Sequence, residues 1–186
     1  LALVDPAAVA GLVLVDPALG VPDAAPAGAG ALGLRIIAEP AVAASVTNPV
    51  ALLPLLRTML ARKEIADRRY GALRQPMRRP GTTQAYACWL PALVASDDGA
   101  ASRTSAGLRS IRPPVALIWG EADTVTPIAQ GEALARLVRP RVFLRLPGVG
   151  HIPHIEDPAA FTAALDQALM RVRAGAAASV EDSSAR

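Results

Sequence analysis

Residues 115–158 read VALIWGEADTVTPIAQGEALARLVRPRVFLRLPGVGHIPHIEDP, and the pattern of this stretch decides the fold. Val115–Trp119 is a short apolar run bounded by proline and glycine, which indicates a buried strand. Thr126 and Pro127 predict the start of a helix, because threonine is a favoured N-cap and proline is tolerated at the first helical position. The alternating pattern of Val142–Leu146 predicts a second strand. The stretch therefore predicts a strand, a helix and another strand.

One carboxylate and one imidazole follow these two predicted strands. Asp123 lies in the loop that leaves the first strand, and His151 follows the turn after the second. Two strands joined through a helix are normally parallel, so their carboxyl ends meet at the same edge of the sheet. That edge is where open α/β sheets place their sites. We therefore expect Asp123 and His151 to share a site.

The two loops also carry glycine motifs, G-x-x-D in the first and G-x-G-H in the second, and a glutamate and a proline follow. The residues that form this pattern are Gly120, Asp123, Gly148, Gly150, His151, Glu156 and Pro158. Together the motifs resemble the seventh and eighth strand ends of the α/β-hydrolase fold, in which the chain order is nucleophile, acid, histidine. The resemblance implies that Asp123 is the acid and His151 the base of a catalytic triad.

The chemistry of acyl transfer explains why these residue types are needed. A hydroxyl attacks poorly at neutral pH unless a base removes its proton, and histidine suits that role. A buried carboxylate on the other ring nitrogen fixes the tautomer and stabilises the imidazolium that forms. Taken singly, Asp123 would be a turn carboxylate and His151 a turn histidine. The two motifs in the right order favour catalysis.

Other residues near these motifs have simpler interpretations. His154 is interpreted as a residue on the rim of the site. Asp16 is a rival acid, because some relatives carry their acid after the sixth strand, but we interpret it as a strand-end carboxylate that shapes a proline turn. A metal site made of His151, His154 and Glu156 is rejected, since the number and spacing of ligands are poor.

The first residues of the chain predict the end of a helix at Leu1–Val4 and a strand at Leu12–Val15. The continuous apolar character of the strand suits burial on both faces. In the resemblance it is the sixth strand, so the nucleophile would precede Leu1. No G-x-S-x-G motif occurs; Ser105 comes closest, but Arg103 replaces the first glycine. We therefore expect the chain alone to lack the nucleophile and oxyanion donors, and to be inactive.

The middle of the chain, residues 20–107, predicts a mostly helical insert, which in the resemblance forms a cap or lid. Tyr86 and Trp89 would line an acyl pocket beneath it or pack on a helix face. The helices are expected at residues 36–44, 49–66, 67–73 and 81–94.

The chain is thus expected to have four parts. Residues 1–19 and 108–173 form the core, 20–107 the cap, and 174–186 a disordered tail. The last helix, at 158–173, begins after Asp157, which caps it. The predicted fold class is α/β: the C-terminal part of an α/β-hydrolase sheet, with the sixth to eighth strands and a helical cap insertion.

Composition bounds the function. The 186 residues are 52% hydrophobic, which excludes a disordered composition, and the net charge of +3 comes from scattered arginines, with Lys63 the single lysine. We expect no nucleic-acid partner. Cys88 is the single cysteine, so neither an intrachain disulfide nor a cysteine metal cluster can form. No apolar run is long enough to cross a bilayer and no signal-peptide pattern occurs. We expect a cytoplasmic location, no cofactor and a small-molecule substrate; the oligomeric state stays open.

Three functions remain at this point. The first is a serine hydrolase acting on carboxylic esters or a related acyl or carbon–carbon bond. The second is a relative with an aspartate nucleophile, of the epoxide hydrolase or haloalkane dehalogenase type. The third is a non-catalytic relative that binds a ligand or a partner. A dinucleotide-binding domain is excluded because no glycine-rich phosphate loop follows a strand. With the sixth strand at an open edge, we expect the chain made alone to be marginally stable or to aggregate.

Overall fold

The computed structural model describes residues 1–19, 49–85, 88 and 100–184. Its centre is a parallel three-stranded sheet of β1 (Leu12–Val15), β2 (Val115–Gly120) and β3 (Val142–Leu146), in the order β1-β2-β3. Leu12 pairs with Val115, and Ala116 pairs with Val142. All three strands were predicted, and their parallel arrangement confirms that the ends of β2 and β3 lie at one edge.

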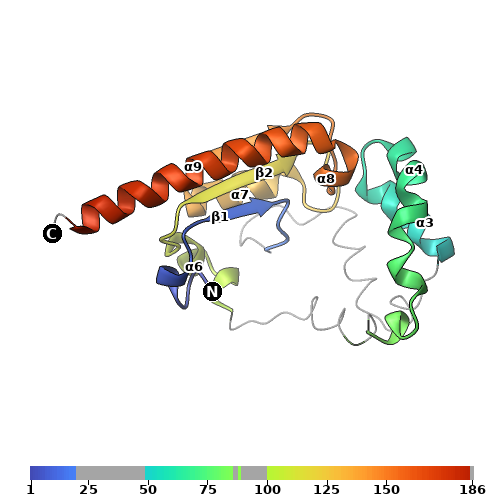
Figure 1. Ribbon diagram of the computed structural model, residues 1–186, viewed down its shortest axis with the longest axis horizontal. Helices are drawn as coiled ribbons and strands as arrows, with labels where there is room; N and C mark the ends of the chain where they lie inside the picture. The colour runs from blue at the N-terminus through green and yellow to red at the C-terminus, as the bar shows by residue number, and fades with distance from the viewer. Residues whose placement is uncertain (20–48, 86–87, 89–99, 185–186) are drawn as a thin grey trace.

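Helices cover the sheet on both faces because successive side chains of a buried strand point to opposite sides. Leu117 and Trp119 of β2 pack with Leu134 of α7 (Ile128–Val138). Ala116 and Ile118 pack instead with apolar residues of α9 (Pro158–Ser184). Figure 1 shows the long α9 running along the sheet, with α7 behind the strands. Every residue of β2 is consequently buried.

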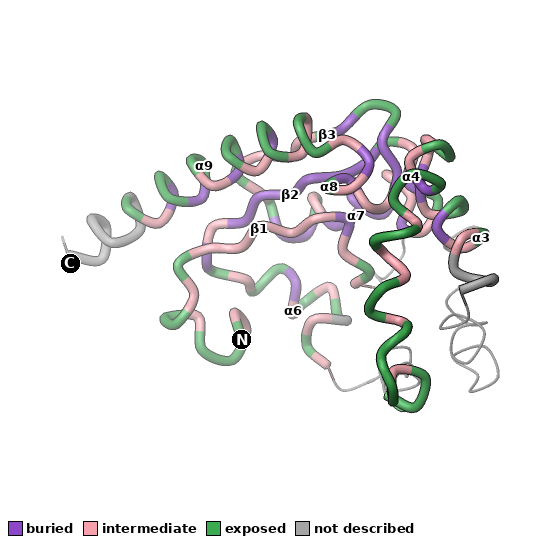
Figure 2. The backbone as a smooth tube through the Cα atoms, turned by 45° about the vertical axis from the view of Figure 1, so that its right-hand side comes forward, coloured by how far each residue is buried: buried purple, intermediate pink, exposed green. Residues whose placement is uncertain are grey.

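The apolar sequence of strand β1 suits burial on both faces, but in the described part of the molecule the strand lies at the open edge that was also expected for it. All four of its residues are only half-buried, and Figure 2 shows them in pink beside the purple β2. The cause is its place in the sheet: among the described strands β1 pairs with β2 alone and forms the edge. Its apolar sequence therefore has less to pack against than β2 has.

The helix predicted at residues 49–66 is two helices. They are α3 (Pro49–Met59) and α4 (Lys63–Leu73), which stand beside α8 (Pro153–Glu156) at the end of the molecule away from the C-terminus (Figure 1). The break is made by distant residues. His151 N donates to Met59 O at 2.8 Å, and Arg62 N donates to the Glu156 carboxylate. These bonds use backbone groups that a continuous helix would have kept for itself.

The remaining elements are short. They are η1 (Pro6–Ala8), η2 (Pro76–Arg78), η3 (Ala101–Arg103) and α6 (Ser105–Arg109). Residues 1–5 form a single hydrogen-bonded turn, in line with the predicted helix end. Residues 82–85 are helical, as predicted. The helix expected at 36–44, and Tyr86 and Trp89 of the last insert helix, lie outside the described residues.

The C-terminal helix begins as predicted but ends later. Asp157 caps α9, since its Oδ1 accepts a hydrogen bond from Ala160 N at 3.0 Å. The helix was expected to stop at residue 173 and give way to a disordered tail; it continues instead to Ser184. Residues 174–184 contain no proline and are rich in alanine, the best helix former, which explains the continuation. No described helix combines the length and apolar character needed to cross a membrane.

Candidate active site

Asp123 and His151 are in direct contact. The Nδ1 atom of His151 lies 2.8 Å from Asp123 Oδ2; the aspartate side chain is fully buried, and the imidazole is 19% exposed. The contact joins the loop after β2 to the loop after β3, as the parallel sheet requires. The predicted proximity of these two residues is therefore confirmed.

The Asp123 carboxylate is held by four hydrogen bonds. Oδ1 accepts from the backbone N–H groups of Val125 and Thr126, at 2.7 and 2.9 Å. Oδ2 accepts from the Thr126 hydroxyl at 2.7 Å and faces His151 Nδ1. An ionised carboxylate can only accept hydrogen bonds, so Nδ1 is the nitrogen that carries the proton. This tautomer leaves Nε2 of His151 with a lone pair that can accept a proton.

Thr126 differs from its predicted role. It was expected to cap the helix that follows, but the N-cap residue of α7 is Pro127, which makes no side-chain cap. The Thr126 hydroxyl binds Asp123 instead, and its carbonyl accepts from the buried Trp119 indole at 2.7 Å. A threonine hydroxyl can either cap a helix or donate a hydrogen bond to a nearby carboxylate, and both roles look the same in the sequence. The sequence therefore could not tell them apart.

Close backbone contact explains Gly120 of the first motif and Gly150 of the second, whereas Gly148 has a φ angle of 65° and open space around it. A Cβ atom added at Gly120 would lie 2.3 Å from Gly150 O and 2.5 Å from Val149 O. The two loops are further joined by the bond from Ala122 N to Val149 O, 2.9 Å long. We call the loop after β2, residues 121–127, the acid loop, and the loop after β3, residues 147–152, the histidine loop. Only residues without a side chain allow these two loops to approach this closely.

Glu156, part of the sequence pattern, anchors the histidine loop. It is 2% exposed, and its Oε2 accepts from Gly150 N at 2.7 Å, while Oε1 accepts from Arg62 N. The end of α3 also reaches the acid loop, where Thr124 Oγ1 donates to Thr58 O at 2.7 Å. Hydrogen bonds thus tie the insert to both loops that carry the site.

Asp16, interpreted above as a strand-end carboxylate, lies inside the site. It is 4% exposed, and its Oδ1 accepts from Gly120 N at 2.9 Å. Burial raises the pKa of Asp16 to about 7, and the neighbouring Asp123 charge adds to this, while the Gly120 bond and His151 oppose it. The sequence offered a signal for this placement, namely a carboxylate at the end of a third parallel strand.

The other residues considered in the sequence lie apart from this pair. His154 is exposed and packs edge-on against Phe161, with ring centroids 5.9 Å apart. Ser105 begins the short helix α6, not a turn between a strand and a helix. Within the described part of the chain, no group of three or more histidine, cysteine or acidic residues is placed to hold a metal.

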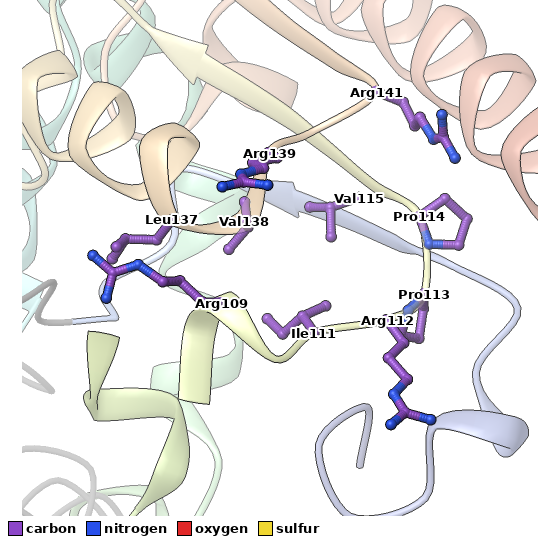
Figure 3. Close-up of a pocket in the computed structure, with 10 residues that line it drawn as sticks. All are labelled: Arg109, Ile111, Arg112, Pro113, Pro114, Val115, Leu137, Val138, Arg139 and Arg141. Atoms are coloured by element: carbon purple, nitrogen blue, oxygen red, sulfur yellow. The ribbon is translucent and has the colours of Figure 1, made fainter. Parts of the chain in front are cut away.

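A cavity of about 360 Å³ lies at the opposite edge of the sheet, where β2 begins and α7 ends. Its lining includes the buried Val115 and four arginines, at positions 109, 112, 139 and 141. Figure 3 shows the guanidinium groups of Arg112 and Arg141 at separate places around the cavity, turned in different directions. The arginines therefore do not converge on one point, and the cavity is separate from the pair of Asp123 and His151.

The model of the alpha/beta hydrolase family matches residues 1–165 of the chain. The chain belongs to the alpha/beta hydrolase family. The parallel sheet with helices on both faces agrees with this membership.

Solved structures are similar in fold. The 2-hydroxy-6-oxo-6-phenylhexa-2,4-dienoate hydrolase from Rhodococcus sp. strain RHA1 has a TM-score of 0.66 at 16% identity, over 90% of this chain and 58% of that one. A thermophilic esterase from Thermogutta terrifontis has a TM-score of 0.60 at 22% identity, over 88% of this chain and 57% of that one. An alpha/beta hydrolase enzyme, MGS-M2, from a Medee basin deep-sea metagenome library has a TM-score of 0.63 at 18% identity, over 87% and 56%. No curated protein matches the chain.

This chain therefore spans less than two thirds of the length of the structures that it resembles. At these identities the likeness concerns the fold, and the reaction has to be argued from the site itself.

Proposed function

We propose that the intact protein is a hydrolase in which a nucleophile, His151 and Asp123 form a catalytic triad. Its substrates would be carboxylic esters or compounds with a related acyl or carbon–carbon bond. The observation that carries the proposal is the 2.8 Å contact between His151 Nδ1 and the fully buried Asp123 carboxylate. Family membership and the hydrolases among the similar structures support the same reaction class.

In the proposed mechanism His151 Nε2 takes the proton of the attacking nucleophile and later gives it to the leaving group. Asp123 holds the imidazole in the productive tautomer and stabilises the imidazolium, and hydrogen bonds from Val125 and Thr126 hold the carboxylate in place. Because the Asp123 side chain is buried, the attraction between the carboxylate and the imidazolium is stronger than it would be in water.

The nucleophile and the oxyanion donors are proposed to come from chain outside the 186 residues. Two observations support this: the sequence holds no G-x-S-x-G motif, and the similar structures are longer than this chain. A triad acts as a unit, so the 186-residue chain made alone is expected to show no esterase turnover. The cytoplasmic location expected from the sequence stays a prediction.

We further propose that residues 20–107 form a cap that admits the substrate. The support lies in α3, whose last residues, Thr58 and Met59, accept hydrogen bonds from Thr124 of the acid loop and from His151. An insert attached at both loops can change the access of a substrate to the imidazole without altering the triad itself. Substrate preference should therefore follow changes in the insert.

The test is turnover of a series of aryl esters by the intact protein. His151→Ala should lower kcat by about 10⁴-fold or more, as removing a triad member does elsewhere. His154→Ala is the matched control, since that histidine is exposed and contacts Phe161, and it should keep its activity. Turnover that survives His151→Ala would refute the triad.

Different substrates separate the two alternatives. An aspartate nucleophile attacks the alkyl carbon of an epoxide or a haloalkane, opening the ring or displacing halide, and water then cleaves the ester intermediate at its carbonyl carbon. A single turnover of such a substrate in ¹⁸O-water would therefore place the label in the enzyme's carboxylate. A non-catalytic relative would show saturable binding but no turnover, with or without His151.

A further inference from the structure

Asp16 is held at the carboxyl end of β1, beside Asp123, by contacts on three sides. Its backbone N donates to Ile118 O at 3.1 Å, its Oδ1 accepts from Gly120 N at 2.9 Å, and Thr126 Oγ1 lies 3.4 Å from its carbonyl oxygen. Its φ angle is 42°, in the left-handed region that a residue with a side chain rarely adopts. The surrounding structure therefore imposes the position of this side chain.

The second carboxyl oxygen of Asp16 is buried and, among the described residues, no donor reaches it. A buried anionic oxygen without a donor is unfavourable. The charged groups that act on Asp16 are Asp123 and His151, and a hydrogen bond with the Asp123 side chain is among the causes that raise the pKa of Asp16. Asp123 is a neighbour through Thr126, whose Oγ1 lies 2.7 Å from Asp123 Oδ2 and 3.4 Å from the Asp16 carbonyl oxygen. Two carboxylates cannot donate to each other, so a stable contact between them requires one proton.

The hydrogen bonds indicate which carboxyl holds that proton. Among the described residues, the Asp123 carboxylate accepts from three protein donors besides His151, whereas the Asp16 carboxyl accepts from Gly120 N alone. Donors favour the ionised form of the group that receives them, and burial without donors favours the neutral form. The pKa of Asp16, raised to about 7 chiefly by burial, agrees with this assignment.

We propose that Asp16 is a positioning residue of the triad, whose protonated carboxyl donates a hydrogen bond from Oδ2 to Asp123 and holds that carboxylate against His151. The expected effect on kcat rests on the proposed function, whereas the position of the proton on Asp16 does not depend on that function. Asp16 acts through Asp123. It thereby couples the carboxyl end of β1 to the loops after β2 and β3.

The kinetic test compares Asp16→Asn with Asp16→Ala in the intact protein. Asparagine keeps an oxygen for Gly120 N and supplies an N–H donor where the protonated carboxyl has its O–H. The kcat of Asp16→Asn should therefore stay within about 3-fold of wild type, a smaller change than the loss of a hydrogen bond to a charged group would cause. Alanine supplies neither, and kcat should fall by about 10- to 100-fold, the worth of one hydrogen bond to a charged group, with KM little changed. Equal loss in both variants would mean that Asp16 acts as an anion, and wild-type kcat in Asp16→Ala would mean that it has no role; either result overturns the proposal.

Infrared spectroscopy tests the proton itself. The wild-type protein at pH 5 should show the C=O stretch of one buried protonated carboxyl, which fades as the pH rises through about 7 and is absent in Asp16→Asn. If the alanine variant does not fold, this spectrum and the Asp16→Asn kinetics still decide the question. A protein without turnover that shows the band would refute the proposed function and keep the assignment of the proton; absence of the band would overturn the assignment.

Discussion

Gly150→Ala tests whether the contact between the insert and the histidine loop contributes to stability. A Cβ atom at this position would lie 2.6 Å from Met59 O, 2.8 Å from Ala61 N and 3.0 Å from Glu156 Oε2. Gly150 is not among the residues with a positive φ, so alanine can adopt its backbone conformation without strain. The expected effect is therefore steric, and two of the three atoms belong to backbone that cannot rotate away.

The size of the effect follows from these contacts. Overpacking of a buried contact costs about 1–3 kcal/mol. Moving α3 away to relieve it would stretch the 2.8 Å bond from His151 N to Met59 O, worth about 1 kcal/mol net. We expect the free energy of unfolding to fall by about 2–4 kcal/mol. Because His151 is the next residue, kcat should also fall, by up to about 10²-fold if the imidazole moves by about 1 Å.

The assay is urea unfolding of the intact protein, with amide hydrogen exchange at His151 as a local measure. The control is Gly71→Ala: that glycine lies inside α4, and a Cβ there meets no atom within 4 Å. Alanine should stabilise that helix by about 0.5–1 kcal/mol, so the same substitution should have opposite signs at the two positions. A Gly150→Ala protein as stable as wild type, with unchanged exchange at His151, would refute the steric argument.

Three further predictions concern the surroundings of the acid. The pKa of Asp16 is 3.8 in the unfolded chain and about 7 in the folded protein, so between pH 4 and 7 the unfolded state loses this proton and the folded state keeps it. Wild-type stability therefore falls as the pH rises through this range. Relative to wild type, Asp16→Asn should gain stability from pH 4 to 7, by at most about 4 kcal/mol. A stability difference that does not change with pH would contradict this. Thr126→Val removes the hydroxyl donor to Asp123 and should lower kcat about 10-fold; unchanged kcat would show that the remaining donors suffice. Trp119→Phe leaves the Thr126 carbonyl without its buried donor and should cost about 1–3 kcal/mol in thermal unfolding, whereas a loss below about 0.5 kcal/mol would mean that water replaces the indole.

Much of the core was predictable because its signals are local. The apolar runs of β2 and β3, and the proline and glycine residues that bound them, depend on neighbours in the chain. The parallel pairing then follows from the crossover helix, and with it the meeting of Asp123 and His151 at one edge. The cap at Asp157 was likewise readable from adjacent residues.

The errors have different physical causes, and a partner far away in the chain explains one of them. Residues 49–66 have a continuous helical pattern, yet His151 and Glu156 take the backbone groups at the break between α3 and α4. Thr126 has the right chemistry for a cap, but Asp123 competes for its hydroxyl. Residues 174–184 were judged by their small and polar character, although an alanine-rich segment without proline can continue a helix that is already formed.

The sequence by itself thus determined the α/β class, the order of β2, α7, β3 and α9, and which carboxylate and imidazole meet. Only the tertiary structure decided that Asp16 is buried against Asp123, that Gly120 and Gly150 are in backbone contact, and that Glu156 joins the insert to the histidine loop. The physical reason is that periodicity and punctuation report local backbone preferences. The protonation of a carboxyl and the closeness of two loops depend on which atoms surround them after folding.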